Sequence, residues 1–274
     1  MTTLTSGQIE GFRESGLLFP IRAMSPGRAG ELRSRLEGVE ARLAGRLPPF
    51  HNTKAHLLLP WLWDLVQDDQ VTAPVAQILG PDLLCWGSSF FAKGPGEAHY
   101  VPWHQDATYW GLTEPIAVTA WIAFTPSTVE NGCLRVAPGS HRSALPHEDA
   151  SERSNMLAGA EKLAVAVDEA AAVDVLLEPG EMSLHHILSV HGSQPNRGVD
   201  RRIGFAIRYI PGHLSQAGDI RGTATLVRGR DRGGFDLEVA PKSDLDPEAL
   251  ERHAVLMRRW AGIVRREVKA SGRA

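Results

Sequence analysis

The chain has two places where one residue separates a histidine from an aspartate, an arrangement that can hold a metal ion. They are His104 with Asp106 and His147 with Asp149. On an extended backbone, positions i and i+2 point to the same side, so the imidazole and the carboxylate of each pair reach one point in space. The chain contains 11 histidines and 32 acidic residues. Such a pair therefore also arises by chance, and the surrounding sequence must separate the two.

The surroundings favour His104 and Asp106. This pair lies among aromatic residues, in the stretch YVPWHQDATYW at 100–110. A polar pair in apolar surroundings is costly unless it is paired or binds a ligand. The stretch HEDASERSN at 147–155 is polar and predicts a solvated loop. On these grounds alone, a metal site and a buried hydrogen-bonded pair are the two alternatives for His104 and Asp106.

A metal centre needs a third ligand, and three histidines downstream of Asp106 are candidates. Two histidines and one carboxylate form the ligand triad of non-haem Fe(II) oxygenases and leave coordination positions open. His191 begins the segment HGSQPN and follows Asp106 by 85 residues (191 − 106), far enough for a strand on the opposite side of a β-barrel. His185 and His186 are adjacent and would face opposite ways on a strand. We interpret both as packed or hydrogen-bonded histidines.

A strand predicted over 203–210 has two different faces. Bulky residues occupy one face and small residues between two arginines occupy the other: Ile203, Phe205, Ile207 and Tyr209 against Arg202, Gly204, Ala206 and Arg208. Small residues leave a cavity, and a guanidinium in a cavity can bind a carboxylate through two parallel hydrogen bonds. We predict that Arg202 binds an anionic ligand, the alternative being a surface arginine pair at a sheet edge.

These residues must be positioned by a β-rich core. From residue 82 onward, apolar and β-branched runs alternate with Gly, Pro and Asn turn signals. They predict strands over 83–92, 116–124, 134–137, 173–177, 182–185 and 203–210. Many short strands of this kind indicate a sandwich, jelly roll or barrel. The polar, alanine-rich stretch 146–168 is predicted as an excursion from it.

Helices are predicted on both sides of the core. A capping box at Thr5 and Gln8 predicts one helix, and Ser25-Pro26 starts another with the apolar stripe Leu32, Leu36, Val39 and Leu43. Residues 58–79 predict one or two more, broken near 68–69. Asp246-Pro247 starts a C-terminal amphipathic helix. We predict a single domain over 1–274, with a helical flank over 1–80, a β core over 81–211 and a C-terminal segment over 212–274.

Composition excludes several classes of protein. The chain has 274 residues and a formal net charge of −3. No apolar run reaches the ~20 residues of a membrane helix, and no signal-peptide pattern opens the chain. Two cysteines are too few for a disulfide framework or a Cys-based metal site, and the slightly acidic charge argues against non-specific nucleic-acid binding. We expect a cytoplasmic protein with a small-molecule substrate; its oligomeric state cannot be read from the sequence.

The ordered motifs of the core resemble the phytanoyl-CoA dioxygenase family of Fe(II)/2-oxoglutarate-dependent oxygenases. The matching stretches are WHQD at 103–106, TAW at 119–121, ENGCL at 130–134, PGSH at 138–141, HGS at 191–193 with PN at 195–196, and Arg202 eleven positions after His191. They follow the family's order between about 83 and 211. The resemblance implies a mainly β fold with helical flanks (α+β), a double-stranded β-helix of the cupin-like jelly-roll type.

The resemblance also implies a role for each matching residue. The iron ligands would be His104, Asp106 and His191. The distal carboxylate of the cosubstrate 2-oxoglutarate would be held by Arg202 and Ser193, with further cosubstrate contacts from Trp121, Thr119, Ser89 and Lys93. Substrate candidates, each near an iron ligand or on the face of Arg202, are Gln105, Tyr109, Trp110 and Arg208.

The implied reaction consumes O2 and 2-oxoglutarate, releases succinate and CO2, and oxidises an unactivated C–H bond. Related halogenases replace the carboxylate ligand by a small residue so that chloride binds the iron. Asp106 fills that position, which favours hydroxylation or another oxidation that begins with hydrogen abstraction. No long basic tract indicates a CoA ester, so we expect a small polar metabolite or a natural-product intermediate as substrate. Two alternatives stay open: a non-catalytic sensor, and a different cupin-type enzyme that uses zinc or manganese.

Overall fold

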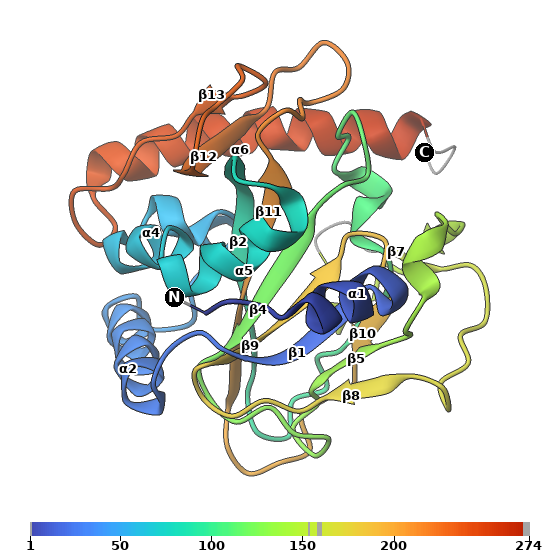
Figure 1. Cartoon of the computed structure of the whole chain (residues 1–274). Helices are drawn as coiled ribbons and strands as arrows, with labels where there is room; N and C mark the ends of the chain where they lie inside the picture. The colour runs from blue at the N-terminus through green and yellow to red at the C-terminus, as the bar shows by residue number, and fades with distance from the viewer. Residues whose placement is uncertain (1, 153, 158–160, 271–274) are drawn as a thin grey trace.

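Two β-sheets packed face to face form the centre of the protein, for which this computed structural model describes residues 2–152, 154–157 and 161–270 (Figure 1). The larger, seven-stranded sheet has the order β1 (Leu17–Arg22), β9 (Glu181–His186), β4 (Val118–Ala123), β11 (Arg202–Pro211), β2 (Leu83–Lys93), β12 (Thr223–Arg228) and β13 (Asp236–Leu237). The smaller, four-stranded sheet has the order β3 (Val101–His104), β10 (His191–Ser193), β5 (Leu134–Val136) and β8 (Val173–Val175). This is the predicted double-stranded β-helix.

Every strand predicted from the sequence is present, within a few residues of its expected ends, as β2, β4, β5, β8, β9 and β11. The excursion at 146–168 is not free of strands, because it contains β6 (His147–Asp149) and β7 (Glu161–Leu163), which pair with each other. The predicted C-terminal segment likewise contributes β12 to the larger sheet. The strands β6 and β7 have only three residues each, over which alternation is too short to be recognised as a strand signal.

The sequence predicted a helical N-terminal flank, but this flank also contains the strand β1, which pairs antiparallel with β9. This strand contains Pro20, which has no backbone N–H group to donate. A central strand needs such donors toward both of its neighbours. β1 lies at the edge of the larger sheet, where a proline is tolerated. The prediction of a helical flank over 1–80 is therefore wrong at these six residues, LLFPIR.

The helices are α1 (Ser6–Ser15), α2 (Pro26–Arg42), α3 (Pro49–Asn52), α4 (Pro60–Val66), α5 (Asp69–Leu79) and α6 (Pro247–Ala270), with short 3-10 turns η1 (Ala55–Leu57), η2 (Asp106–Tyr109) and η3 (Ser140–Arg142). Thr5 forms the predicted capping box and Ser25 caps α2. Leu43 does not join the buried stripe of α2. The helix ends at Arg42, and Leu43 is 37% exposed.

The predicted alternation along β11 decides which face carries the site. Its bulky residues, Ile203, Phe205, Ile207 and Tyr209, are fully buried in one apolar cluster with residues of α4 and α5. The α5 helix contacts β2, β4 and β11, so this face of the larger sheet is covered by helices (Figure 1). The other face, which carries Arg202 and Arg208, turns toward the smaller sheet.

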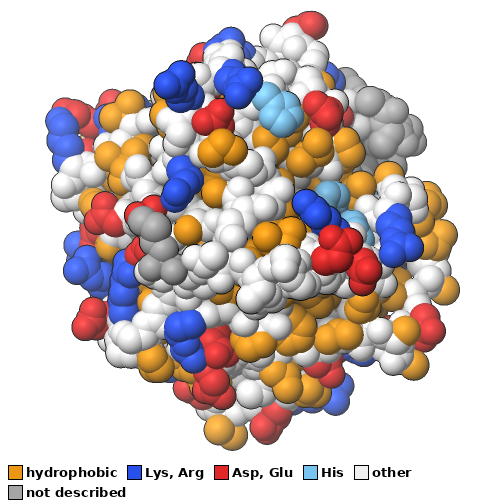
Figure 2. All heavy atoms as spheres, viewed as in Figure 1, with side chains coloured by type: hydrophobic (Ala, Val, Ile, Leu, Met, Phe, Trp, Pro, Cys, Tyr) orange, Lys and Arg blue, Asp and Glu red, His pale blue; other side chains and the backbone are white. Residues whose placement is uncertain are grey.

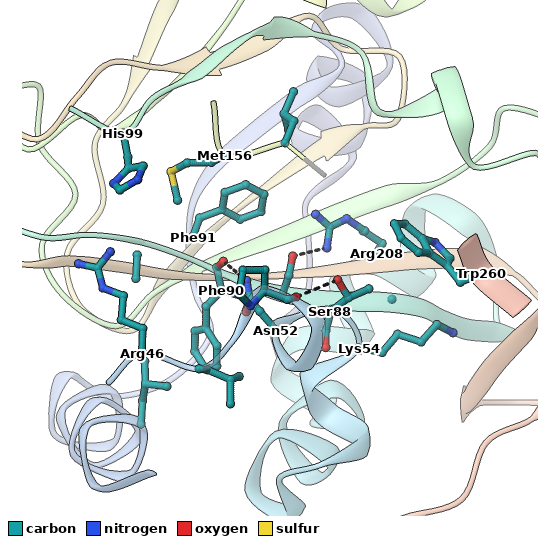
Figure 3. Close-up of a pocket in the computed structure, with 18 of the residues that line it drawn as sticks. Arg46, Asn52, Lys54, Ser88, Phe90, Phe91, His99, Met156, Arg208 and Trp260 are labelled. Carbon is teal, nitrogen blue, oxygen red and sulfur yellow. Dashed lines mark hydrogen bonds between the residues drawn. The ribbon is translucent and has the colours of Figure 1, made fainter. Parts of the chain in front are cut away.

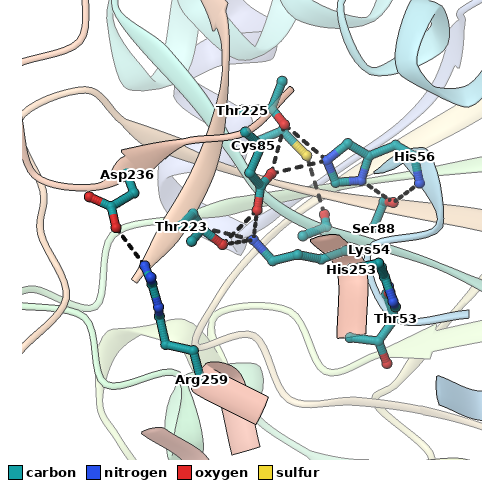
Figure 4. A network of polar contacts seen from close by, with 12 residues as sticks. Thr53, Lys54, His56, Cys85, Ser88, Thr223, Thr225, Asp236, His253 and Arg259 are labelled. Atoms are coloured by element: carbon teal, nitrogen blue, oxygen red, sulfur yellow. Dashed lines mark hydrogen bonds and ion pairs between the residues drawn. The ribbon is translucent and has the colours of Figure 1, made fainter. Parts of the chain in front are cut away.

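A buried polar network ties the segment before η1 to the end of the larger sheet (Figure 4). Lys54 Nζ donates to the carbonyl oxygen of Thr223 at 2.8 Å and forms an ion pair with Glu238. His56 Nδ1 lies 2.8 Å from Ser88 Oγ. Both side chains of the Lys54–Glu238 pair are at most 5% exposed, so each charge depends on the other for compensation.

Removing the carboxylate from this network is expected to destabilise the fold at neutral pH. Burial opposes the charge on Glu238, but Lys54 and His56 outweigh it and hold the pKa at about 2, below the ordinary value of 4.5. A pKa depressed by folding gives stability that is complete above the unfolded value and is lost as the pH falls through the folded value. Glu238→Gln should therefore lower the free energy of unfolding by about 3–5 kcal/mol at pH 7.

Urea unfolding followed between pH 7 and pH 2 measures this effect. The stability of the wild type should fall over that range more steeply than that of Glu238→Gln. The matched control is Glu248→Gln, which breaks an exposed pair with Lys242 at 2.8 Å and should cost less than about 1 kcal/mol. Equal unfolding midpoints for Glu238→Gln and wild type would show that the network contributes nothing.

Charges of both signs are interspersed over the face seen in Figure 2, in line with the small formal net charge of −3. Throughout the part of the chain that the structure describes, no helix has the length and apolar character needed to cross a membrane.

Candidate metal centre and cosubstrate site

The three predicted metal ligands converge between the two sheets. His104 ends β3, Asp106 begins η2 and His191 begins β10. One possible ligand atom from each residue lies within 4.8 Å of the others. His104 and His191 are cross-strand partners with ring centroids 4.1 Å apart. The expectation that His191 lies on the opposite side of the barrel was wrong, because β10 pairs directly with β3.

Backbone carbonyl groups fix the orientation of both imidazoles. Nδ1 of His104 lies 2.9 Å from the carbonyl oxygen of Pro102, and Nδ1 of His191 lies 2.8 Å from that of Ser189. Because a carbonyl only accepts hydrogen bonds, each Nδ1 carries a proton, which leaves Nε2 for a ligand. Metal-binding histidines are held by such carbonyl contacts. The two Nε2 atoms lie 3.4 and 4.0 Å from Asp106 Oδ1.

Asp106 supplies a negative charge to this centre. Burial opposes that charge, but the contact with His104 and the electrostatic interactions with His191 and Arg208 outweigh it, so the pKa of the carboxyl lies well below its usual range. Thr119 Oγ1 donates to Asp106 Oδ2 at 3.3 Å and orients the second oxygen. Two imidazoles and one carboxylate are the donor set of the non-haem Fe(II) triad.

Arg202 lies beside this centre as a buried cation that forms no ion pair with any described residue. Its side chain is 1% exposed, and Nε and Nη2 have no hydrogen-bond partner among the described residues. Burial lowers the pKa of the guanidinium to about 10, so it stays charged at neutral pH. Its Cζ atom lies 5.3 Å from the ring centroid of Trp121. A buried guanidinium with unpaired N–H groups is costly, and a carboxylate ligand would satisfy it.

Lys93 supports Ser193 from behind the cavity. Its Nζ lies 2.6 Å from Ser193 Oγ and also contacts the carbonyl oxygens of Ser193 and Gln194. Burial and the charge of neighbouring Arg202 lower the pKa of Lys93 to about 6. The amine of Lys93 thus donates its hydrogen bonds to Ser193 and Gln194. Of Lys93 and Ser193, it is Ser193 that lines the cavity.

The residues that line the cavity around the triad include most of the predicted ones: His104, Asp106, His191, Arg202, Ser193, Trp121, Thr119 and Arg208. Two other candidates, Ser89 and Trp110, line a larger neighbouring cavity. Gln105 turns away, because its amide donates to the carbonyl oxygens of Ser143 and Leu188 and accepts from the Leu145 N–H. Tyr109 ends η2, and its side chain lies outside what the structure describes.

Sequence reasoning missed His185 as a lining residue. It lies opposite Thr119 in the β4–β9 pairing, and its ring centroid is 4.7 Å from that of His191. Its Nδ1 has no hydrogen-bond partner among the described residues, and burial lowers its pKa to about 4. The available signal was alternation, since Ser183 and His185 share the face of β9 opposite to Met182 and Leu184.

Among the described residues, the second histidine–aspartate pair joins no group of three possible metal ligands. It does not lie in a solvated loop either. It belongs to strand β6, where Asp149 is exposed. His147 Nε2 accepts a hydrogen bond from the backbone N–H of Gln105 at 2.9 Å, and its Nδ1 lies 2.9 Å from the carbonyl oxygen of Leu145. His147 thus braces the residue between the two ligands His104 and Asp106.

Gly204 makes room for an aromatic ring. A Cβ atom at this position would lie 1.8 Å from Cζ2 of Trp121. The prediction that small residues on this face of β11 leave a cavity therefore holds at Ala206, which lines it, and fails at Gly204, where the indole fills the space.

Gly204→Ala is expected to push the Trp121 ring away from Arg202. The extra methyl group should cost about 1–3 kcal/mol of stability through overpacking. Displacement of the ring should raise the KM for 2-oxoglutarate about tenfold or more. Gly38→Ala is the matched control, because Gly38 is exposed on α2 and, apart from its chain neighbours and the nearby backbone of its own helix, no described atom lies within 4 Å of the added Cβ. Steady-state kinetics and thermal unfolding of both variants test this, and an unchanged KM for Gly204→Ala would contradict it.

Comparison with known proteins adds three findings. The profile of the family described as phytanoyl-CoA dioxygenase (PhyH) matches residues 12–204. The apo structure of a non-heme monooxygenase, ThoJ, is 35% identical with a TM-score of 0.86 and covers 96% of this chain and 99% of its own. The structure of CytC3 with Fe(II) and alpha-ketoglutarate is 24% identical with a TM-score of 0.66, covers 89% and 95% of the two chains, and shares the fold.

Among curated proteins, Dioxygenase lolE1 of Epichloe uncinata is 29% identical over 140 residues, which are 51% of this chain and 50% of that protein. Ectoine dioxygenase of Streptomyces coelicolor is 26% identical over 167 residues, 56% of each. The chain spans about half the length of the curated relatives it matches.

Proposed function

Because the chain belongs to the phytanoyl-CoA dioxygenase family, we propose that it is an Fe(II)- and 2-oxoglutarate-dependent dioxygenase that oxidises an unactivated C–H bond of a small molecule. One observation carries the proposal: His104, Asp106 and His191 converge next to the guanidinium of Arg202, whose Nε and Nη2 have no hydrogen-bond partner among the described residues. The triad accounts for a metal ion with open positions. The guanidinium accounts for a cosubstrate that has a second carboxylate.

The chain's own residues would hold and orient the reactants. Bound Fe(II) supplies the oxidising chemistry with O2 and 2-oxoglutarate, and His104, Asp106 and His191 would hold it. The carbonyl contacts of both histidines keep Nε2 available, and Thr119 keeps the Asp106 carboxylate in one orientation. The polypeptide thus contributes pre-organised ligands.

Arg202 and Ser193 would bind the distal carboxylate of 2-oxoglutarate. Arg202 offers the free Nε and Nη2 donors. The Ser193 hydroxyl is held by Lys93, and the Trp121 ring packs against the guanidinium. A carboxylate bound in this buried pocket would be shielded from water, which strengthens the charge-assisted hydrogen bonds.

We further propose that the outcome is hydroxylation of a small polar metabolite or a natural-product intermediate. Asp106 supports this choice over halogenation, since its carboxylate fills the position that chloride would need. Other oxidations that begin with the same hydrogen abstraction would use the same residues. The name of the ectoine dioxygenase relative is compatible with a small polar substrate.

Release of succinate by the anaerobically reconstituted protein tests the proposal. Protein with Fe(II) and 2-oxoglutarate is exposed to O2 with a panel of amino acids, their derivatives and natural-product fragments, and succinate is quantified. Succinate formation that depends on both Fe(II) and 2-oxoglutarate is expected. Bound 2-oxoglutarate with no turnover under any condition would favour a sensor, and retention of zinc or manganese in place of iron would favour a different metalloenzyme.

A further inference from the structure

A cavity of about 470 Å³ lies beside the metal centre (Figure 3). It shares two lining residues, Phe91 and Arg208, with the cavity around the triad. Figure 3 shows Arg46 and His99 on one side of it and Trp260 on the other. Its volume lies within the range of small-molecule sites, and the shared residues place one part of it next to the metal ligands.

Aromatic and aliphatic side chains form much of the wall. Trp86 and Trp110 stack with ring centroids 4.4 Å apart and an interplanar angle of 14°. The other apolar groups of the wall include Trp260, Phe91, Met156 and Leu157. A wall of this kind favours a ligand with an apolar body.

The cations that line this cavity differ in whether a carboxylate neutralises them. Arg46 is paired with Glu97 at 2.9 Å, Arg201 with Glu40 at 2.7 Å, and Lys54 with Glu238. Arg208 has no carboxylate partner among the described residues. Among the described residues, its guanidinium donates one hydrogen bond, from Nη1 to Ser89 Oγ at 2.8 Å.

The Arg208 guanidinium is also held in place. Its Cζ atom lies 5.8 Å from the ring centroid of Phe91 and 5.9 Å from that of Trp110. The residue lies on the same face of β11 as Arg202, and its charge acts on the pKa of Asp106. A positioned, half-buried guanidinium that forms no ion pair with a described carboxylate is suited to bind an anion through parallel hydrogen bonds.

We propose that this cavity binds a substrate with an apolar body and an anionic group, a carboxylate or a phosphonate, and that Arg208 binds the anionic group. The proposal rests on the proposed function, because it names the substrate class of that oxygenase. An anion on Arg208 is anchored at the boundary with the metal centre. The atoms next to the anionic group would then lie closest to the metal ligands, with the apolar body along the tryptophans.

Three matched probes test the proposal by binding alone: 6-phenylhexanoate, 6-phenylhexanamide and 6-phenylhexylphosphonate. Each is titrated by calorimetry into the full-length protein loaded with Mn(II) and 2-oxoglutarate. The wild type should bind one of the two anions at least about tenfold more tightly than the neutral amide, and the better anion identifies the group. Arg208→Gln should abolish this preference, and Arg208→Lys should retain part of it.

Two controls make the result specific. Arg46→Gln, which removes a cation of the same cavity that already has a partner, should keep the preference for the anion. The affinity of Arg208→Gln for 2-oxoglutarate should stay within about threefold of the wild type.

Equal affinity for acid and amide, no binding of any probe, or an unchanged preference in Arg208→Gln would overturn the proposal. A large loss of 2-oxoglutarate affinity in Arg208→Gln would assign the residue to the cosubstrate instead. Anion binding without succinate release on any substrate would leave this site standing while the proposed oxygenase function fails.

Discussion

Arg202→Gln is expected to weaken 2-oxoglutarate binding about 100-fold or more, while metal binding is retained. Removing one partner of a buried, hydrogen-bonded charge pair costs about 3–5 kcal/mol, and each 1.4 kcal/mol is a factor of about ten. The unfolding midpoint should not fall, because the wild-type guanidinium is buried with unpaired N–H groups. Calorimetric titration of 2-oxoglutarate into the Mn(II)-loaded protein measures the affinity, and thermal unfolding measures the stability.

Arg201 provides the matched control for this experiment. It is adjacent in sequence, but its guanidinium binds Glu40 with two hydrogen bonds. Arg201→Gln should therefore lower stability and leave the 2-oxoglutarate affinity within about threefold of the wild type. Arg202→Lys should remain weak, because an ammonium lacks the planar fork that binds both carboxylate oxygens. If Arg202→Gln binds 2-oxoglutarate as tightly as the wild type, the assignment is wrong, and Arg201 and Arg208 are the next candidates.

The faces of the strands could be predicted from the sequence, because a period of two is a local property. The alternation from Arg202 to Tyr209 assigned one face to the core, where its bulky residues lie. Arg202, Ala206 and Arg208 of the other face line the cavity around the triad. Which strands pair is not local. His104 and His191 are direct cross-strand neighbours although a long stretch of chain separates them, and the three-residue strand β10 is too short to give a pattern.

Side-chain contacts between distant parts of the chain could not be predicted from the sequence either. Gly204 matters because the Trp121 ring, contributed by the neighbouring strand β4, occupies its side-chain space. The Lys54–Glu238 pair joins residues that are 184 positions apart in the sequence. Both contacts join residues that are close only in the folded chain. Motif spacing predicts proximity only for residues of one helix or strand, or of one family motif.

His104→Ala is expected to abolish Fe(II) binding and 2-oxoglutarate turnover. The imidazole offers Nε2 to the centre while its Nδ1 is held by Pro102, and neither Asp106 nor His191 can replace a lost nitrogen donor. With only two protein ligands left, the affinity for a divalent metal should fall by at least about 100-fold. Equilibrium dialysis with anaerobic Fe(II), followed by metal analysis, measures this independently of activity.

Asp149→Ala is the control that separates the two histidine–aspartate pairs. Asp149 has the same spacing from His147 that Asp106 has from His104, but it is exposed on β6. Its loss should leave both the metal content and succinate release unchanged, because its carboxylate is not among the groups that converge with His191. Loss of metal in Asp149→Ala, together with retention in His104→Ala, would place the centre at the other pair. The expected contrast would show that burial between the two sheets, and not the spacing alone, makes His104 and Asp106 ligands.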